Sequence, residues 1–238
     1  MSTDDDGILS INAADLSMLQ LSDSFFPTGM YSMSNGLEAI FYSGKKMKAE
    51  ELRELIAILL QYQIGPADCT ALGNAYEQAA KFNLPELLEV DKALFSMKLV
   101  QEIRDASIRS GTQLVRCIRS FSNNKTLCQY EDAIRSGRAF GPYPVALAVA
   151  ANAFLIPKEK AALIMLYSFS VSIVGAALRL GMLQHFDGQK VIDELKPTIL
   201  KVIKENINRP PEGIWQFAPS TDIIQISHER MNSKMFIT

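Results

Sequence analysis

The chain has 238 residues and a mass of 26.4 kDa, with 48% hydrophobic and 21% charged residues. This is the composition of an ordinary globular protein, and it excludes disordered, collagen-like and low-complexity chains. The 24 basic and 26 acidic side chains give a net charge of -2, which argues against a strongly basic nucleic-acid surface.

The start of the chain and its cysteines indicate a cellular compartment. Asp4, Asp5 and Asp6 make the start unlike a secretory signal or a transit peptide, and we expect residues 1–12 to be flexible. The three cysteines are odd in number and not closely paired, which predicts no disulfide framework and a reducing cytoplasm. Because they fall on apolar helical faces, we expect buried, inert thiols at Cys69, Cys117 and Cys128.

Apolar residues recur at helical spacing along the chain, and no stretch shows the alternation typical of a strand. Gly65-Pro66 is predicted to break the first long helix, with Pro66 beginning the next. Asp187 is predicted to cap a helix that Pro197 kinks or restarts. Further helices are expected from Pro85, over 100–121, and from Pro144 and Lys158. The sequence therefore predicts an all-α fold: a single-domain bundle of roughly eight to eleven helices over 1–238.

Two of these helices have distinctive compositions. The stretch 100–121 carries Ala106, Ser107, Ser110 and Gly111 in the middle of its apolar stripe, which would let another helix approach closely. Ala161–Leu178 has no charge and is just long enough to be weighed as a membrane span. We interpret it as a buried core helix, with a membrane helix as the alternative.

Familiar catalytic motifs are missing. The sequence contains no G-x-x-x-x-G-K-[ST] phosphate loop, no G-x-G-x-x-G and no G-x-S-x-G. No acid–base pair stands out, so no catalytic residue is assigned. No metal site is assigned either; His185 and His228 are the only imidazoles available, and each is more typical of a structural or interface role.

One irregular segment near the N-terminus is dense in polar side chains. It runs from Ser22 to Ser34, where Pro27 and Gly29 fix a turn, and Asn35 with Glu38 forms a predicted capping box for the next helix. So many donors and acceptors in one connection indicate a rigid loop that presents a binding surface, although a plain helix connection would also fit.

A second such segment spans 209–238 and begins with an irregular stretch, Arg209–Thr221, that holds the only tryptophan, Trp215. Asp222 and Gln225 form a second predicted capping box. A helical face is then predicted through Ile224, His228, Met231 and Met235. A terminal segment this apolar docks either on its own domain or on a partner.

Several short motifs in this order together resemble the UreF family of urease accessory proteins over nearly the whole chain. They are Gln20–Ser24, Pro27–Gly29, Ser34–Glu38, Ala106–Gly111, Gly141–Val145, Leu166–Ser168, Ala176–Gly181, Asp187–Gln189, Asp222-Ile223 and His228-Glu229.

The resemblance implies a cytoplasmic, all-α homodimer that is not an enzyme. Members bridge a UreD/UreH-type accessory protein to the GTPase UreG, and the complex loads nickel, with a carbamylated lysine, into apo-urease. It further implies that nickel and GTP are handled by the partners, that this chain has no cofactor of its own, and that it modulates the GTPase cycle. On this reading no nucleic acid and no membrane is a partner.

The residues that we expect at partner interfaces lie in the two polar segments and at one arginine between them. They are Asp23, Ser24, Pro27, Thr28, Gly29, Tyr31, Gly36, Glu38, Arg179, Asp222, His228, Glu229 and Lys234. The C-terminal segment is expected to contact the UreD/UreH-type protein. Arg179 and the N-terminal loop are expected to contact the GTPase.

The chain departs from the family pattern at four positions. Met33 and Pro142 stand where many members carry His, so we expect no nickel relay through them. Lys234 and Ile237 stand where Arg is frequent, and lysine lacks the planar fork of donors that arginine has. A different polar anchoring of the tail is therefore expected.

Two other classes of protein compete with this interpretation. A stand-alone helical metal-binding protein or enzyme would need carboxylates and histidines facing into the bundle, but no Glu-x-x-His occurs. A small membrane-associated helical protein would rest on Ala161–Leu178 alone.

Overall fold

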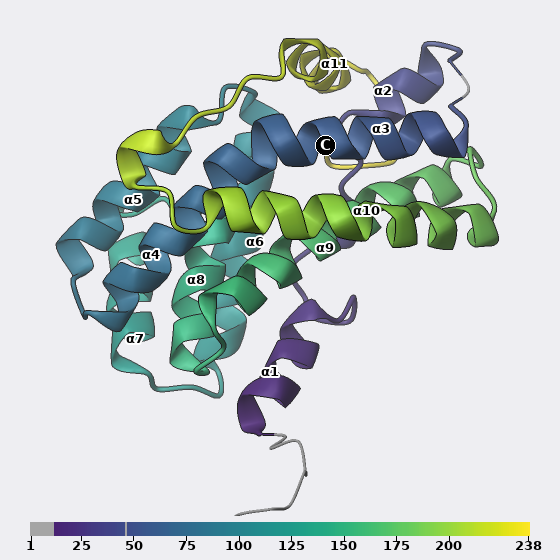
Figure 1. Cartoon of the computed structure of the whole chain (residues 1–238). Coiled ribbons are helices and arrows are strands. Elements are labelled where there is room, and N and C mark those ends of the chain that lie inside the picture. Colours follow the sequence, from purple (N-terminus) through teal and green to yellow (C-terminus); the bar gives the residue numbers. More distant parts are fainter. Residues whose placement is uncertain (1–11, 46) are drawn as a thin grey trace, which may run out of the picture.

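The structure is a computed structural model that describes residues 12–45 and 47–238, so the predictions made for residues 1–11 lie outside the described residues. All regular elements in the described ranges are helical, which confirms the predicted fold class (Figure 1). The elements are α1 (Ala13–Ser22), η1 (Met30–Ser32), α2 (Leu37–Tyr42), α3 (Ala49–Leu59), η2 (Leu60–Cys69), α4 (Thr70–Ala80), α5 (Leu84–Met97), α6 (Gln101–Arg119), α7 (Lys125–Arg135), α8 (Tyr143–Ala153), α9 (Lys158–Arg179), α10 (His185–Asn206), η3 (Pro211–Gly213) and α11 (Pro219–Glu229).

The centre of the bundle is α8, which is buried from Tyr143 to Ala151. Helices α4, α6, α7 and α9 pack around it. A helix that is apolar on every side can be stable only when other helices surround it, and α8 meets that condition.

A close backbone approach to the start of this helix occurs at Gly111 of α6. A Cβ atom added there would lie 2.1 Å from the carbonyl oxygen of Gly141 and 2.8 Å from the amide nitrogen of Tyr143. The small residues in the middle of 100–121 therefore do allow the predicted close approach. The segment that approaches is the start of α8.

The burial of the apolar helices distinguishes a core helix from a membrane span. Two helical stretches of the described chain are long and apolar enough by composition to cross a membrane, Ala49–Ala80 and Lys158–Arg179. In these helices 72% and 67%, respectively, of the apolar window is buried inside the protein. Such burial is typical of core helices and supports the core interpretation of Ala161–Leu178.

The predicted break at Gly65-Pro66 is wrong, because the chain stays helical from Ala49 to Ala80 through the π-helical turn η2. Pro66 has no amide N–H, so a regular α-helical bond to Tyr62, four residues earlier, is impossible. The carbonyl of Tyr62 instead accepts the N–H of Phe217 at 2.8 Å, and that of Pro66 accepts the N–H of Trp215 at 3.3 Å. The irregular segment before α11 thus satisfies backbone groups at the proline.

The predicted start of α10 is also wrong. The helix begins at His185, its N-cap is Gln184, and Asp187 lies at the third helical position, where it accepts the N–H of Gln184. Pro197 lies inside α10, which continues to Asn206 and does not restart.

The cysteines behave as predicted at one position of three. Cys69 is buried, and burial with the nearby Asp68 carboxylate raises the pKa of its thiol to about 12. Cys117 and Cys128 are only half-buried, so the prediction of buried thiols is wrong at these two positions.

Candidate functional site

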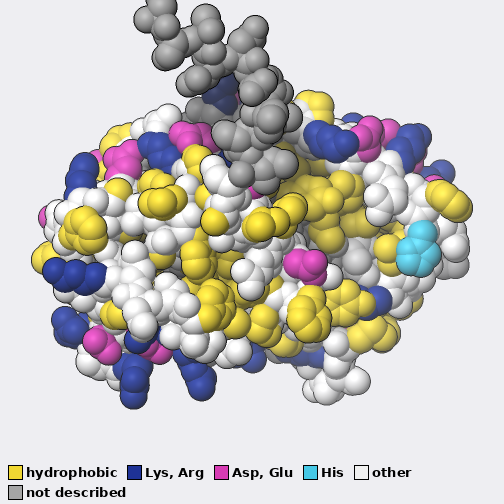
Figure 2. Space-filling view, turned by 90° about the horizontal axis from the view of Figure 1, so that it is seen from below, with side chains coloured by type: hydrophobic (Ala, Val, Ile, Leu, Met, Phe, Trp, Pro, Cys, Tyr) yellow, Lys and Arg dark blue, Asp and Glu magenta, His cyan; other side chains and the backbone are white. Residues whose placement is uncertain are grey.

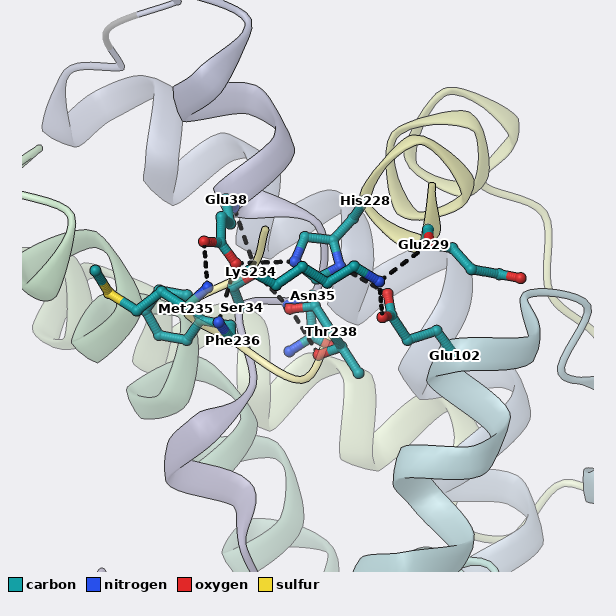
Figure 3. A network of polar contacts seen from close by, with 10 residues as sticks. All are labelled: Ser34, Asn35, Glu38, Glu102, His228, Glu229, Lys234, Met235, Phe236 and Thr238. Carbon is teal, nitrogen blue, oxygen red and sulfur yellow. Dashed lines mark hydrogen bonds and ion pairs between the residues drawn. The ribbon is translucent and has the colours of Figure 1, made fainter. Parts of the chain in front are cut away.

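The N-terminal loop and the C-terminal tail, about 200 residues apart in sequence, lie side by side in the structure (Figure 3). The N–H of Ser34 donates to the carbonyl of Thr238 at 2.8 Å, and the N–H of Ile237 donates to the carbonyl of Ser32 at 2.8 Å. We call residues 23–36 together with residues 230–238 the loop–tail surface. Two segments that are irregular on their own become one ordered surface by pairing with each other.

A buried carboxylate on α2 holds the tail. Glu38 is fully buried, and its two oxygens accept the backbone N–H groups of Met235 at 2.7 Å and Phe236 at 3.0 Å. Backbone N–H groups buried without an acceptor are costly, so this carboxylate fixes where the tail lies.

The same carboxylate joins the tail to α11 and α6 through His228. The Nε2 atom of the His228 ring lies 3.0 Å from Oε2 of Glu38, and the Nδ1 atom lies 2.6 Å from Oε2 of Glu102 on α6. Because a carboxylate only accepts, both contacts are satisfied when both ring nitrogens donate. The ammonium group of Lys234 joins the same network, with its Nζ 2.7 Å from Glu102.

The pH dependence of this network follows from Glu38. Burial alone would raise the pKa of its carboxyl group, but the hydrogen bonds from Met235, His228 and Phe236 outweigh burial and hold the pKa below its ordinary value of 4.5. A carboxyl group with a lowered pKa stabilises the folded state above its unfolded pKa, and this contribution is lost as pH falls through the folded pKa.

We therefore expect the difference in unfolding free energy between the wild type and Glu38→Gln to be largest near neutral pH and to shrink below pH 4.5. Urea denaturation of both proteins over a series of pH values measures this difference. A difference that stays constant as the solution is acidified would contradict the assignment.

Both predicted capping boxes are wrong. Asn35 has a left-handed backbone with φ of 53°, and its N–H points to the hydroxyl of Thr238. The carboxylate of Glu38 is occupied by the tail, and Gly36 precedes the first residue of α2 with φ of 90°. A Cβ atom at Gly36 would also lie 3.0 Å from the side chain of Ile224 in α11. Both the left-handed backbone and this close contact therefore favour glycine at this position.

In α11, Asp222 and Gln225 lie inside the helix, and Ala218 is the N-cap. The amide group of Gln63 in η2 donates to Asp222 at 3.1 Å and to Gln225 at 3.3 Å, so both residues anchor α11 to the body. The helix ends at Glu229, and Met231 and Met235 therefore do not continue its face.

Arg179 lies at the end of α9 and is inserted between the loop and the tail. Its guanidinium carbon lies 4.0 Å from the centre of the Tyr31 ring and 4.4 Å from that of Phe236, and its Nη2 donates to the carbonyl of Tyr31. Such stacking uses the planar form of arginine and orders both segments. The side chain is half-buried, which leaves part of it facing solvent.

The predicted interface residues divide into an exposed and a supporting set. Those that are exposed on the loop–tail surface or beside it are Asp23, Ser24, Pro27, Gly29, Tyr31, Glu229 and Lys234, while Thr28, Arg179 and Asp222 are half-buried. Gly36, Glu38 and His228 are buried, so their side chains support the surface and are not available to a partner.

Sequence reasoning missed Glu102 altogether, and it assigned no individual role to Ser34, Phe236 and Thr238, although these three lie in the two predicted segments. Their roles depend on contacts between distant parts of the chain, and no local spacing indicates them. His185 is exposed at the start of α10 and is not among the hydrogen-bond partners of His228. In the ranges 12–45 and 47–238, no three His, Cys, Asp or Glu side chains are placed to hold a metal ion.

The fold and this site define an all-α protein in which buried groups hold the N-terminal loop and the C-terminal tail together as one ordered surface. The sequence model of the UreF family matches residues 47–196. Similar proteins include the urease accessory protein UreF of Trichodesmium erythraeum, 29% identical over 93% of this chain and 95% of its own length, and that of Bacillus sp. strain TB-90, 27% identical over 94% and 98%. The urease accessory protein UreF 1 of Brucella melitensis is 30% identical over 93% and 92%.

The chain belongs to the UreF family of urease accessory proteins. Its role is in urease maturation, and like these accessory proteins it is not an enzyme.

Proposed function

We propose that the protein is a cytoplasmic adaptor that bridges a UreD/UreH-type accessory protein and a UreG-type GTPase during nickel insertion into apo-urease. The observation that carries this proposal is the loop–tail surface, which buried groups of α2, α6, α9 and α11 hold in place. An adaptor needs preformed contact surfaces, because ordering them during binding would weaken the association.

The proposal divides the work between two parts of this surface. The tail, with Lys234 and the exposed Met235, contacts the UreD/UreH-type protein. The loop, with Tyr31 and the solvent-facing part of Arg179, contacts the GTPase and modulates its cycle by ordering its switch loops. Nickel and GTP stay with the partners.

A matched pair of substitutions tests the tail. Met235 and Leu200 are exposed to 61% and 62%, and Leu200 lies on α10 outside the loop–tail surface. We expect Met235→Glu to weaken binding of the UreD/UreH-type protein about tenfold or more, and Leu200→Glu to leave it unchanged, in titrations with purified proteins. Equal affinities for both variants would contradict the placement.

The proposed effect on the GTPase needs a separate measurement. The rate of GTP hydrolysis by the GTPase is measured at fixed nickel, with and without this chain. We expect this chain to change the rate, and an unchanged rate would contradict the proposed modulation.

A second surface supports a homodimer. Leu16 and Leu19 of α1 are exposed to 65% and 60%, and Tyr167 and Val171 are partly exposed on α9, the helix that α1 packs against. Figure 2 shows apolar side chains gathered on the face where α1 lies. Contiguous exposed apolar area of this kind marks an interface, and we propose a second copy of this chain as its occupant.

Light scattering coupled to size-exclusion chromatography tests the dimer. We expect twice the chain mass for the wild type and for Leu200→Glu, and the single-chain mass for Leu16→Glu/Leu19→Glu, because buried carboxylates without partners are costly. A wild type that elutes as a monomer at all concentrations, or a double variant that stays dimeric, would contradict this interface.

A further inference from the structure

A groove runs beside the loop–tail surface, between it and α6. It encloses about 690 Å³. One wall is formed by Pro27, Thr28 and Gly29 of the loop, and the other by Arg109, Gln113 and Arg116 of α6. Met33 and Ala106, which are both buried, and Ile237 of the tail add apolar lining. The groove therefore combines apolar surface with a basic edge.

The two arginines of this groove differ from the other two arginines on the same helix. Arg104 lies 5.1 Å from the centre of the Phe95 ring and donates to a backbone carbonyl, and Arg119 pairs with Glu131 at 3.1 Å. Arg109 and Arg116 are exposed, and neither has an ion pair or a side-chain hydrogen bond to the described residues.

The arginines of the groove are also correctly spaced to act together. Residues seven apart on an α-helix lie on the same side, about 10 Å apart along the axis. Each guanidinium group can bind one carboxylate with two parallel hydrogen bonds, and the apolar surface between them can accept a side chain.

We propose that this groove binds an acidic segment of a partner protein, with two carboxylates about 10 Å apart and an apolar side chain between them. The proposal rests on the adaptor function proposed above, because it supplies that adaptor with a defined docking site. Two single positive charges that flank apolar surface suit such a segment better than a compact phosphate group, which would need the charges close together.

The test is a charge reversal with a matched control. Arg109→Glu/Arg116→Glu changes the groove, and Arg135→Glu/Arg138→Glu makes the same change in charge at exposed arginines of α7 and the turn after it. Binding of the purified UreD/UreH-type protein and of the purified GTPase is measured by interferometry at low and high salt. We expect the groove variant to lose about tenfold or more in affinity for one of the two, the control to stay within about twofold, and high salt to weaken the wild type. Wild-type affinity of the groove variant for both partners would overturn the proposal.

A direct probe separates the groove from the adaptor function. If the wild type binds neither purified partner, the adaptor function fails, and the groove is judged with a short peptide of Glu and Leu against the same peptide with Gln for Glu. The measurement is the NMR chemical shifts of the backbone amides of α6. Shifts that change on addition of the Glu peptide to the wild type, but not to Arg109→Glu/Arg116→Glu, support the groove. No response, or an equal response to inorganic pyrophosphate, overturns it.

Discussion

Replacing Glu38 with alanine is expected to release the C-terminal tail and to lower the free energy of unfolding by about 3–5 kcal/mol. The substitution leaves the N–H groups of Met235 and Phe236 without their acceptor, and it leaves a buried His228 facing only one carboxylate. Breaking a buried ionic network by removing one partner is costly because the remaining groups stay desolvated.

Two measurements distinguish loss of the tail from general unfolding. Urea denaturation gives the free energy, and hydrogen exchange at Met235 and Phe236 reports directly on the tail. Glu229→Gln is the control, because Glu229 is exposed and only its backbone carbonyl takes part in the network. Protected tail amides and unchanged stability in Glu38→Ala would show that the carboxylate does not hold the tail.

Replacing Gly111 with alanine is expected to destabilise the protein by about 3 kcal/mol, at the upper end of what overpacking usually costs. The added methyl group would meet backbone atoms of Gly141, Pro142 and Tyr143, which cannot move aside as a flexible side chain can. The gain in helix propensity from glycine to alanine, about 1 kcal/mol, is too small to compensate.

Gly175→Ala provides the matched control for this prediction. Gly175 is also inside a helix, α9, but the nearest atom to an added Cβ is the end of the Arg179 side chain at 4.0 Å. We expect this variant to be as stable as the wild type or slightly more stable, by up to about 1 kcal/mol. Thermal unfolding of both variants decides the point, and equal melting temperatures for them would contradict the close approach of α6 to the start of α8.

The helical fold was predictable from the sequence because its signals are periodic and local. The apolar stripe of 100–121 predicted both α6 and the close approach at Gly111, and Pro85, Pro144 and Lys158 marked the starts of α5, α8 and α9 to within a residue. The prediction failed at Pro66, where the chain continues as a π-helix and a distant segment donates hydrogen bonds to the carbonyls of Tyr62 and Pro66.

The candidate site was predictable only in part. The polar density of 22–34 and the apolar tail indicated two surface segments, but nothing local indicated that they would pair. The spacing of Asn35 and Glu38 is that of a capping box, yet Glu38 binds amides about 200 residues away in sequence. A buried carboxylate with distant backbone partners has no pattern in a single sequence, because its partners are set by packing and not by spacing.

The central claim is that this chain joins two other proteins, and the mass of the purified assembly tests it most directly. The UreD/UreH-type protein and the GTPase are mixed with nickel and GTP, in the presence or absence of this chain. Light scattering after size-exclusion chromatography then gives the molar mass of each species in the mixture. We expect one assembly that contains all three proteins, and no association of the two partners without this chain. Association of the two partners in its absence, or elution of this chain separately from both, would contradict the account.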